Sequence, residues 1–348
     1  MQAIGRCLNV FLLFIVFCAY ACDARAASCT TQSQMTAPQR TALSSEARTL
    51  LGQMQNGDTQ GLRSNTIPAV ANDFSGIAAS VQYLKPLIQN AAVTVDNLYI
   101  LDASTQPAGV ARSDFYCGQP VVALNFTNLP AGMYALTILH ATGVPQPQQV
   151  SLILANAGPG QGDKWMFAGL FIKPMVMAGH DGLWYWTSAR DYAQKNMDWN
   201  ASLYYRIAMD LLNPLDALSS PNREKLEHEM DKVKSASLPG ATPTLLAAAG
   251  QNYSVTGIGT TTAFGGLDLD VHYAPDASQA AQLHDPPAAR QQVVNMMTAL
   301  LEQHPEIHQA FHGIWVHADQ GQTSVFALDL PMDGIPGGSS MSQHPTAH

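Results

Sequence analysis

The chain has 348 residues, of which 47% are apolar and only 12% are charged, and its 26 acidic residues outnumber its 17 basic ones. So high an apolar content excludes a wholly disordered chain. The net charge of −9 argues against a dedicated nucleic-acid-binding protein, which normally carries a basic surface. The length suffices for two or three domains with buried cores.

Residues 1–26 have the pattern of an export signal. Arg6 precedes an apolar run of 16 residues, and Ala24 and Ala26 then place small side chains where signal peptidase requires them. The run is short for a membrane-spanning helix, which needs about 20 residues. We therefore predict cleaved export and a periplasmic or secreted protein.

The two cysteines that follow this segment, Cys29 and Cys117, allow three interpretations. In an oxidising compartment they would form one disulfide. That bond would close a loop of about 90 residues and stabilise the fold by about 4 kcal/mol. Alternatively, Ala26-Ala27-Ser28-Cys29 resembles a lipobox, although Ala replaces the usual Leu three residues before the cysteine. Cys29 would then carry a lipid tether. Two unpaired thiols are the third alternative.

The first part of the mature chain predicts two helices followed by strands. Apolar residues at helical spacing predict helices over 37–61 and 65–84. We expect Lys85-Pro86 to stop the second helix, because the residue before a proline disfavours the α conformation. Apolar runs separated by regular turns then predict an antiparallel, hairpin-connected sheet. Its strands are expected at 93–101, 120–126, 133–140, 149–155 and 165–172.

This order of elements resembles the NTF2-like (cystatin-like) superfamily over residues 27–178. The most similar part is Gln149–Pro174, where a strand and a polar turn lead into Ala168-Gly169-Leu170-Phe171 as in the last two strands of that superfamily. The resemblance implies a helix pair on an antiparallel sheet, with an interior pocket that is catalytic in some members. The polar residues expected there, and our weak candidates for catalysis, are Tyr99, Asp102 and His140.

Residues 179–235 predict a helical region. Asp181 is expected to cap its first helix, the alternative being that His180 and Asp181 form a catalytic pair. A third helix, from Arg223 to Lys234, is highly charged and is expected to be exposed. The first two helices resemble a tetratricopeptide hairpin through the spacing of small and aromatic residues. These residues are Ala189, Tyr192, Ala201, Tyr205 and Ala208.

Tryptophan and tyrosine are concentrated in the same helices. Aromatic side chains supply a large contact area at low entropic cost, so such a cluster is typical of binding grooves as well as of cores. We expect most of these side chains to be core. Trp186 and Arg190 are the residues that we expect to face a ligand-binding cleft.

The rest of the chain predicts a second α+β unit. Residues 236–250 are rich in Ser, Ala, Pro and Gly and predict a linker. Residues 251–332 predict a β-α-β-β module, whose strand over 267–273 alternates apolar residues with two aspartates and a histidine. Residues 333–348 predict a disordered tail.

Several histidines raise the question of a metal site. His304, His308 and His312 are spaced i, i+4, i+8, with His317 following, and an unbroken helix would align the first three for zinc. Pro305 interrupts that helix, and no acidic or cysteine ligand completes the set. We therefore predict a polar helix end, with no metal and no cofactor. Common catalytic motifs are also missing from the sequence.

As a whole the sequence resembles an exported bacterial protein of the α+β class. We predict a non-enzymatic binding or scaffold protein of the envelope, periplasmic, secreted or held at the outer membrane by a lipid. Its partner would be an unknown protein or small molecule and not nucleic acid. The alternative is a periplasmic hydrolase or isomerase that uses the pocket of the first domain. Convergence of the three catalytic candidates in a deep pocket would favour the enzyme, and an interior filled by Leu, Ile and Phe would favour the binding protein.

Overall fold

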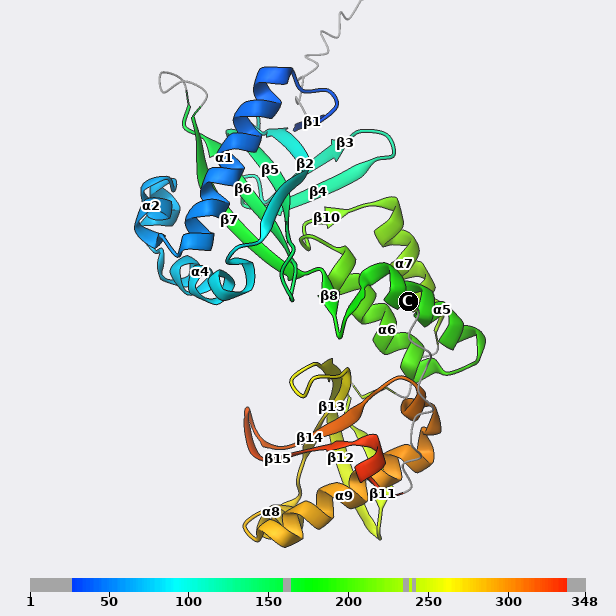
Figure 1. Cartoon of the computed structure of the whole chain (residues 1–348). Helices are drawn as coiled ribbons and strands as arrows, with labels where there is room; N and C mark the ends of the chain where they lie inside the picture. The colour runs from blue at the N-terminus through cyan, green and yellow to red at the C-terminus, as the bar shows by residue number, and fades with distance from the viewer. Residues whose placement is uncertain (1–26, 159–163, 234–237, 240–241, 337–348) are drawn as a thin grey trace, which may run out of the picture.

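The chain has an α+β fold in which helices pack on mainly antiparallel sheets (Figure 1). The predicted export signal lies outside the part of the chain that the structure describes, as does the tail from residue 337 onward. Within the described part, no helix is both long and apolar enough to cross a membrane. The residues that the computed structural model describes are 27–158, 164–233, 238–239 and 242–336.

The N-terminal part is built on a five-stranded antiparallel sheet of order β1-β2-β5-β6-β7. Helices cover one of its faces, and the buried side chains between them include Leu43, Leu50 and Leu84 (Figure 1). The helices are α1 (Ala37–Asn56), α2 (Thr59–Ser64), α3 (Pro68–Ala71) and α4 (Ser75–Ile88). The strands are β1 (Ser28–Thr31), β2 (Ala92–Asp102), β5 (Met133–Thr142), β6 (Gln148–Asn156) and β7 (Trp165–Pro174).

A second, smaller sheet covers the other face. It has the order β10-β4-β3, and Phe115, Leu124 and Leu136 are fully buried between the two sheets. Both faces of the large sheet are therefore filled by apolar side chains. The small sheet consists of β3 (Arg112–Cys117), β4 (Val122–Thr127) and β10 (Leu218–Ser219).

A disulfide joins the two sheets. Cys29 of β1 is bonded to Cys117 at the end of β3, with 5.2 Å between their Cα atoms. This confirms the predicted pairing. Because a bonded sulfur cannot also be alkylated by a lipid, the structure has the disulfide in place of the tether.

The predicted helix over 65–84 is wrong at both ends and is divided into α3 and α4, with residues 72–74 between them. Residues 65–67 instead run alongside β7, where Ile67 N–H donates to the Phe167 carbonyl over 2.9 Å. Helix α4 continues through Pro86 to Ile88. Proline is tolerated there because it costs one hydrogen bond in the last turn, while Leu84 and Ile88 on either side of it are fully buried.

The helical region begins as predicted. The Asp181 carboxylate accepts a hydrogen bond of 2.8 Å from Trp184 N–H, so Asp181 is the N-cap of the first helix. The charged third helix is less exposed than expected, because Leu226 is buried and Glu229 points inward to a salt bridge. The elements are β8 (Val176–Met177), β9 (His180–Asp181), α5 (Gly182–Gln194), α6 (Asp198–Leu212) and α7 (Pro221–Lys232).

The C-terminal sheet has five strands in sequence order, β11 to β15, and helix α9 packs on one face through Val293 and Met296. Strands β13 and β14 are parallel, joined across the sheet by α8 and α9. The strands are β11 (Thr244–Ala248), β12 (Gln251–Thr261), β13 (Asp268–Ala274), β14 (Gly313–Gln320) and β15 (Thr323–Pro331). The helices are α8 (Ala277–Gln282), α9 (Pro286–Gln303) and the 3₁₀ turns η1 (Pro305–Gln309) and η2 (Met332–Gly334).

Two expectations about this region need correction. Part of the predicted linker forms β11, which pairs with β12, because Leu246 and Ala248 alternate into the core. The predicted tail is ordered at its start, where Ile335 is only 2% exposed.

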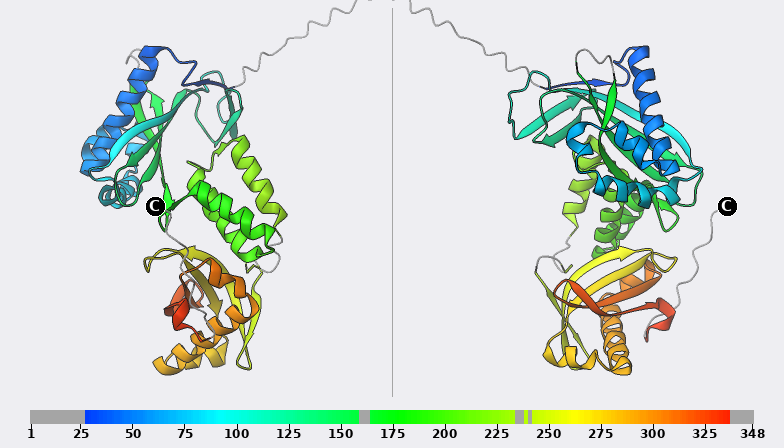
Figure 2. Two further views of the ribbon diagram at one scale, coloured as in Figure 1. Left: turned by 45° about the vertical axis from the view of Figure 1, so that its right-hand side comes forward. Right: turned by 90° about the vertical axis from the view of Figure 1, so that its left-hand side faces the viewer.

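The helical region and the C-terminal sheet share one buried cluster of side chains. Tyr204 of α6 donates a hydrogen bond of 2.8 Å to the Ala310 carbonyl, and Asn200 donates one of 2.6 Å to the Glu306 carbonyl. Figure 2 shows the helices α5–α7 lying between the N-terminal sheets and the C-terminal sheet. Helices α5 and α6 therefore share their core with the C-terminal sheet, whereas β10 of the same region belongs to the small N-terminal sheet.

Candidate metal centre

The face of the C-terminal sheet that points away from α9 carries acidic and histidine side chains. In β13, Leu269 and Val271 are fully buried on the α9 side. Successive side chains of a strand point to opposite faces, so Asp270 and His272 lie on the other face. In β14 the same alternation buries Val316, so its neighbours Trp315 and His317 lie on the same face as Asp270.

The parallel pairing of β13 with β14 brings two histidines together. His272 lies directly opposite His317, with 4.5 Å between the ring centroids and 8° between the ring planes. Asp270, two residues before His272 in β13, lies on the same face. Asp270, His272 and His317 each offer a ligand atom, and these three atoms lie within 4.8 Å of one another.

Hydrogen bonds orient both imidazoles. His272 Nδ1 is 2.6 Å from the Asp319 carboxylate, which can only accept, so this nitrogen carries the proton. His317 Nδ1 is 3.3 Å from Ser324 Oγ, whose own proton is donated to the Phe326 carbonyl. His317 Nδ1 is therefore also the donor. In the neutral form of each histidine, the lone pair is therefore on Nε2.

These lone pairs converge on one carboxylate oxygen. Asp270 Oδ1 is 3.3 Å from His317 Nε2 and 3.5 Å from His272 Nε2. Among the described residues, neither Asp270 Oδ1 nor His317 Nε2 has a hydrogen-bond partner, although both atoms are buried. A cation between these three atoms would satisfy them, since a buried polar atom without a partner is unfavourable.

The electrostatic environment keeps His317 in the form that binds metals. Burial lowers its pKa, the Asp270 carboxylate raises it and His272 lowers it again, with a lowered pKa as the result. At neutral pH His317 is therefore uncharged. A neutral imidazole is the form that donates a lone pair to a metal.

The cluster is bordered by glycines of β12 and by the ring of Trp315. On β12, Gly257 and Gly259 lie opposite His272 and Asp270, and a side chain at Gly259 would meet nothing within 4 Å. On the other side, the Trp315 ring lies 4.1 Å from the His317 ring. Three protein ligands beside open space are typical of a metal site that keeps a position for water or another ligand.

The other predicted histidines do not join this cluster. His304 stacks on Trp199 with 3.8 Å between ring centroids, and His312 Nδ1 lies 3.1 Å from Asp268. His308 lies in η1, where burial lowers its pKa. Of these four histidines, only His317 belongs to the potential metal-binding group found among the described residues.

The three catalytic candidates of the N-terminal domain do not converge. Tyr99 faces the small sheet and lines a pocket of about 500 Å³. It pairs with Leu136 of β5, which is four residues from His140. Burial raises the pKa of Tyr99 and nearby Asp96 raises it further. His140 contacts Gln149 at 3.1 Å, and Asp102 accepts hydrogen bonds from Ser104.

Trp186 and Arg190 are paired inside the helical region and do not line either pocket described in the N-terminal domain. Trp186 is 7% exposed, and its indole N–H donates to Glu229 over 2.7 Å. Arg190 binds both oxygens of Glu229, at 2.6 and 2.9 Å, and its guanidinium lies 4.5 Å from the Trp186 ring centroid. The hydrogen bonds from Arg190 hold the pKa of Glu229 below its usual value. The arrangement ties α5 to α7.

Our sequence reasoning missed Asp270, His272 and Asp319. The signal was present as Asp-x-His in one strand and His-x-Asp in another, since residues two apart share one face. In the sequence alone, this alternation is equally typical of an ordinary amphipathic strand with one solvent-facing side.

Comparisons with protein-family models, with curated proteins and with solved structures found no match. The fold and the site therefore define the class only coarsely. The chain is a disulfide-bonded α+β protein that carries an aspartate–histidine cluster on its C-terminal sheet.

Proposed function

We propose that this protein is an exported binding protein whose C-terminal sheet holds one divalent transition-metal ion. The ligands are Asp270 Oδ1, His272 Nε2 and His317 Nε2. The single observation that carries the proposal is the convergence of these three potential ligand atoms. Imidazole nitrogen with carboxylate oxygen suits Zn²⁺ and related first-row metals, whereas Ca²⁺ and Mg²⁺ prefer oxygen alone.

The hydrogen bonds that orient the two imidazoles are also those expected around a bound metal. Metal-bound histidines almost always donate their other ring N–H to a carboxylate or another acceptor, which fixes the tautomer. Asp319 does this for His272, and Ser324 does it for His317. A purely structural histidine pair would not need both Nε2 atoms aimed at one unpartnered carboxylate oxygen.

The proposal also includes export and the two fold resemblances. Export is supported by the signal-like sequence over 1–26 and by the disulfide, which forms in oxidising compartments. An NTF2-like arrangement is supported by the helices on one face of the large sheet. A tetratricopeptide-like α5–α6 hairpin is supported by Ala189, Ala201 and Ala208, which are fully buried.

Metal titration tests the proposal. We expect the purified protein, stripped with a chelator, to bind one Zn²⁺ by isothermal titration calorimetry, and the bound ion to raise the melting temperature. His272→Ala removes a ligand and should weaken binding by more than 100-fold. Asp319→Asn removes only an orienting carboxylate and should weaken it by about 10–100-fold.

His284→Ala is the matched control, because His284 is exposed and lies in the α8–α9 connection. It should leave zinc affinity unchanged. The proposal fails if the stripped protein binds no zinc, or if His272→Ala and His284→Ala bind it equally. Far-ultraviolet circular dichroism of each variant separates loss of the site from loss of the fold.

A further inference from the structure

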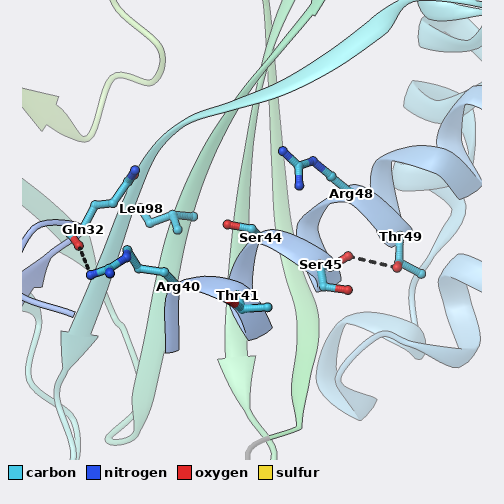
Figure 3. A pocket seen from close by; sticks show the side chains of 8 residues that line it. All are labelled: Gln32, Arg40, Thr41, Ser44, Ser45, Arg48, Thr49 and Leu98. Carbon is cyan, nitrogen blue, oxygen red and sulfur yellow. Dashed lines mark hydrogen bonds between the residues drawn. The ribbon is translucent and has the colours of Figure 1, made fainter. Parts of the chain in front are cut away.

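A second polar site lies at the opposite end of the molecule, on helix α1. A pocket of about 580 Å³ opens between this helix and the start of the large sheet, and we call it the α1 pocket. Figure 3 shows Arg40 and Arg48 towards its two ends with Ser44 between them. The residues that line it are Gln32, Arg40, Thr41, Ser44, Ser45, Arg48, Thr49 and Leu98.

The helical repeat explains this composition. Residues four apart lie on one face of an α-helix, so Arg40, Ser44 and Arg48 form one row. A parallel row of hydroxyl side chains, Thr41, Ser45 and Thr49, runs beside it. The two arginine Cα atoms are about 12 Å apart along the helix at 1.5 Å per residue, so the space above Ser44 lies between the two side chains.

The charge of the α1 pocket differs from that of the whole chain. The protein has a net charge of −9, yet among the described residues that line this pocket two are arginines and none is acidic. Two guanidinium groups and no carboxylate in one pocket favour an anionic ligand.

The two arginines are held differently. Arg40 is anchored to the preceding loop, since its guanidinium donates to the carbonyls of Gln32 and Met35. Arg48 makes no hydrogen bond or ion pair with any residue that the structure describes, and it is exposed. Gln32 Oε1, also in the lining, is buried without a partner among these residues. The pocket thus offers a ligand the anchored guanidinium of Arg40, the unpaired guanidinium of Arg48 and the unpaired side-chain oxygen of Gln32.

Size and lining together indicate the ligand class. Small-molecule pockets span roughly 300–1,000 Å³ and are usually apolar. The α1 pocket falls within that range of volume, but Leu98 is its one apolar lining residue among those described. Hydroxyl and amide groups match a ligand that itself carries many hydroxyls, and guanidinium groups match phosphate or carboxylate.

We propose that the α1 pocket binds a small, hydroxyl-rich acid, such as a sugar phosphate or a sugar acid, with its anionic group between Arg40 and Arg48. The hydroxyl row on α1 and Gln32 hydrogen-bond to the rest of the ligand. This site is independent of the proposed metal centre.

Calorimetric titration with glucose 6-phosphate, glucuronate and glucose tests the proposal. We expect the two acids to bind and neutral glucose not to bind. The acid that binds more tightly identifies phosphate or carboxylate as the preferred group. Arg48→Ala should weaken binding of the preferred acid by about tenfold or more, because a charge-assisted hydrogen bond is lost. Alanine is the best helix former, so this variant keeps the fold.

Arg206→Ala, which removes an exposed arginine of α6, is the matched control and should bind like the wild type. The His272→Ala variant should also bind normally, which separates this site from the metal centre. The proposal is overturned if neither acid binds at millimolar concentration, if glucose binds as well as the acids, or if Arg48→Ala leaves the affinity unchanged.

Discussion

Replacing both Cys29 and Cys117 by serine measures what the disulfide contributes to stability. The two cysteines are separated by 88 residues. For a loop of that length the chain-entropy model gives about 4.6 kcal/mol at 25 °C. Folded domains are commonly stable by about 5–15 kcal/mol in total, so this bond would be a large part of the stability of the N-terminal unit.

The position of β1 gives a structural reason to expect such a large effect. This strand has four residues and lies at the edge of the large sheet, paired with β2. So short an edge strand frays easily once its covalent link to β3 is removed. The double variant should therefore lose the β1 pairing at lower denaturant concentrations than the rest of the sheet.

Equilibrium unfolding in guanidinium, followed by near-ultraviolet circular dichroism, measures the loss. We expect the double variant to be less stable by about 3–5 kcal/mol. Wild-type protein in reductant should unfold at the same midpoint as the double variant, which controls for effects of the serine side chains. A loss below about 1 kcal/mol, or a wild-type midpoint that reductant leaves unchanged, would refute the reasoning.

Two further substitutions test the packing of the helical region. Glu229→Gln should cost about 1–2 kcal/mol at pH 7, because the doubly hydrogen-bonded pair with Arg190 is lost. Since the folded-state pKa of Glu229 is lowered, its contribution is present above the unfolded value of about 4.3 and disappears as the pH falls through the folded value. Urea unfolding should thus show a smaller difference at pH 3 than at pH 7, and an equal difference would contradict this account. Tyr204→Phe removes the buried bond to the Ala310 carbonyl and should cost about 1–2 kcal/mol. Tyr83→Phe, at a 69% exposed position, should cost nothing measurable in the same assay.

The parts of the fold that could be predicted from sequence are those with a long apolar repeat. The strands expected at 133–140 and 149–155 are present as β5 and β6, because each buries a run of apolar residues. Strands β1 and β3 could not be predicted because Ser28–Thr31 and Arg112–Cys117 are short and lack a long apolar run. Their pairing depends on neighbours that lie far away in the sequence.

The aspartate–histidine cluster shows the same limit. The alternation of Asp270 and His272 on one strand is visible in the sequence, but the partner strand is not. His317 comes 45 residues later, beyond two helices, and only the parallel register places it opposite His272. Trp186 and Arg190 are the opposite case, in which a site predicted from residue types is not available to a ligand. Their residue types suit a binding cleft, yet Glu229, on a helix that we expected to be exposed, occupies both of them.

The parallel ladder between β13 and β14 also constrains how this protein can change during evolution. Side chains alternate with a period of two, so a one-residue insertion or deletion within either strand would turn its polar row toward α9 and its apolar row toward solvent. The core and the cluster would be lost in the same event. A point substitution at His272 or Asp270 would instead remove the cluster and leave the apolar face intact. Descendants of this chain can therefore lose the site without losing the sheet, but they cannot shift the sheet register and keep the site.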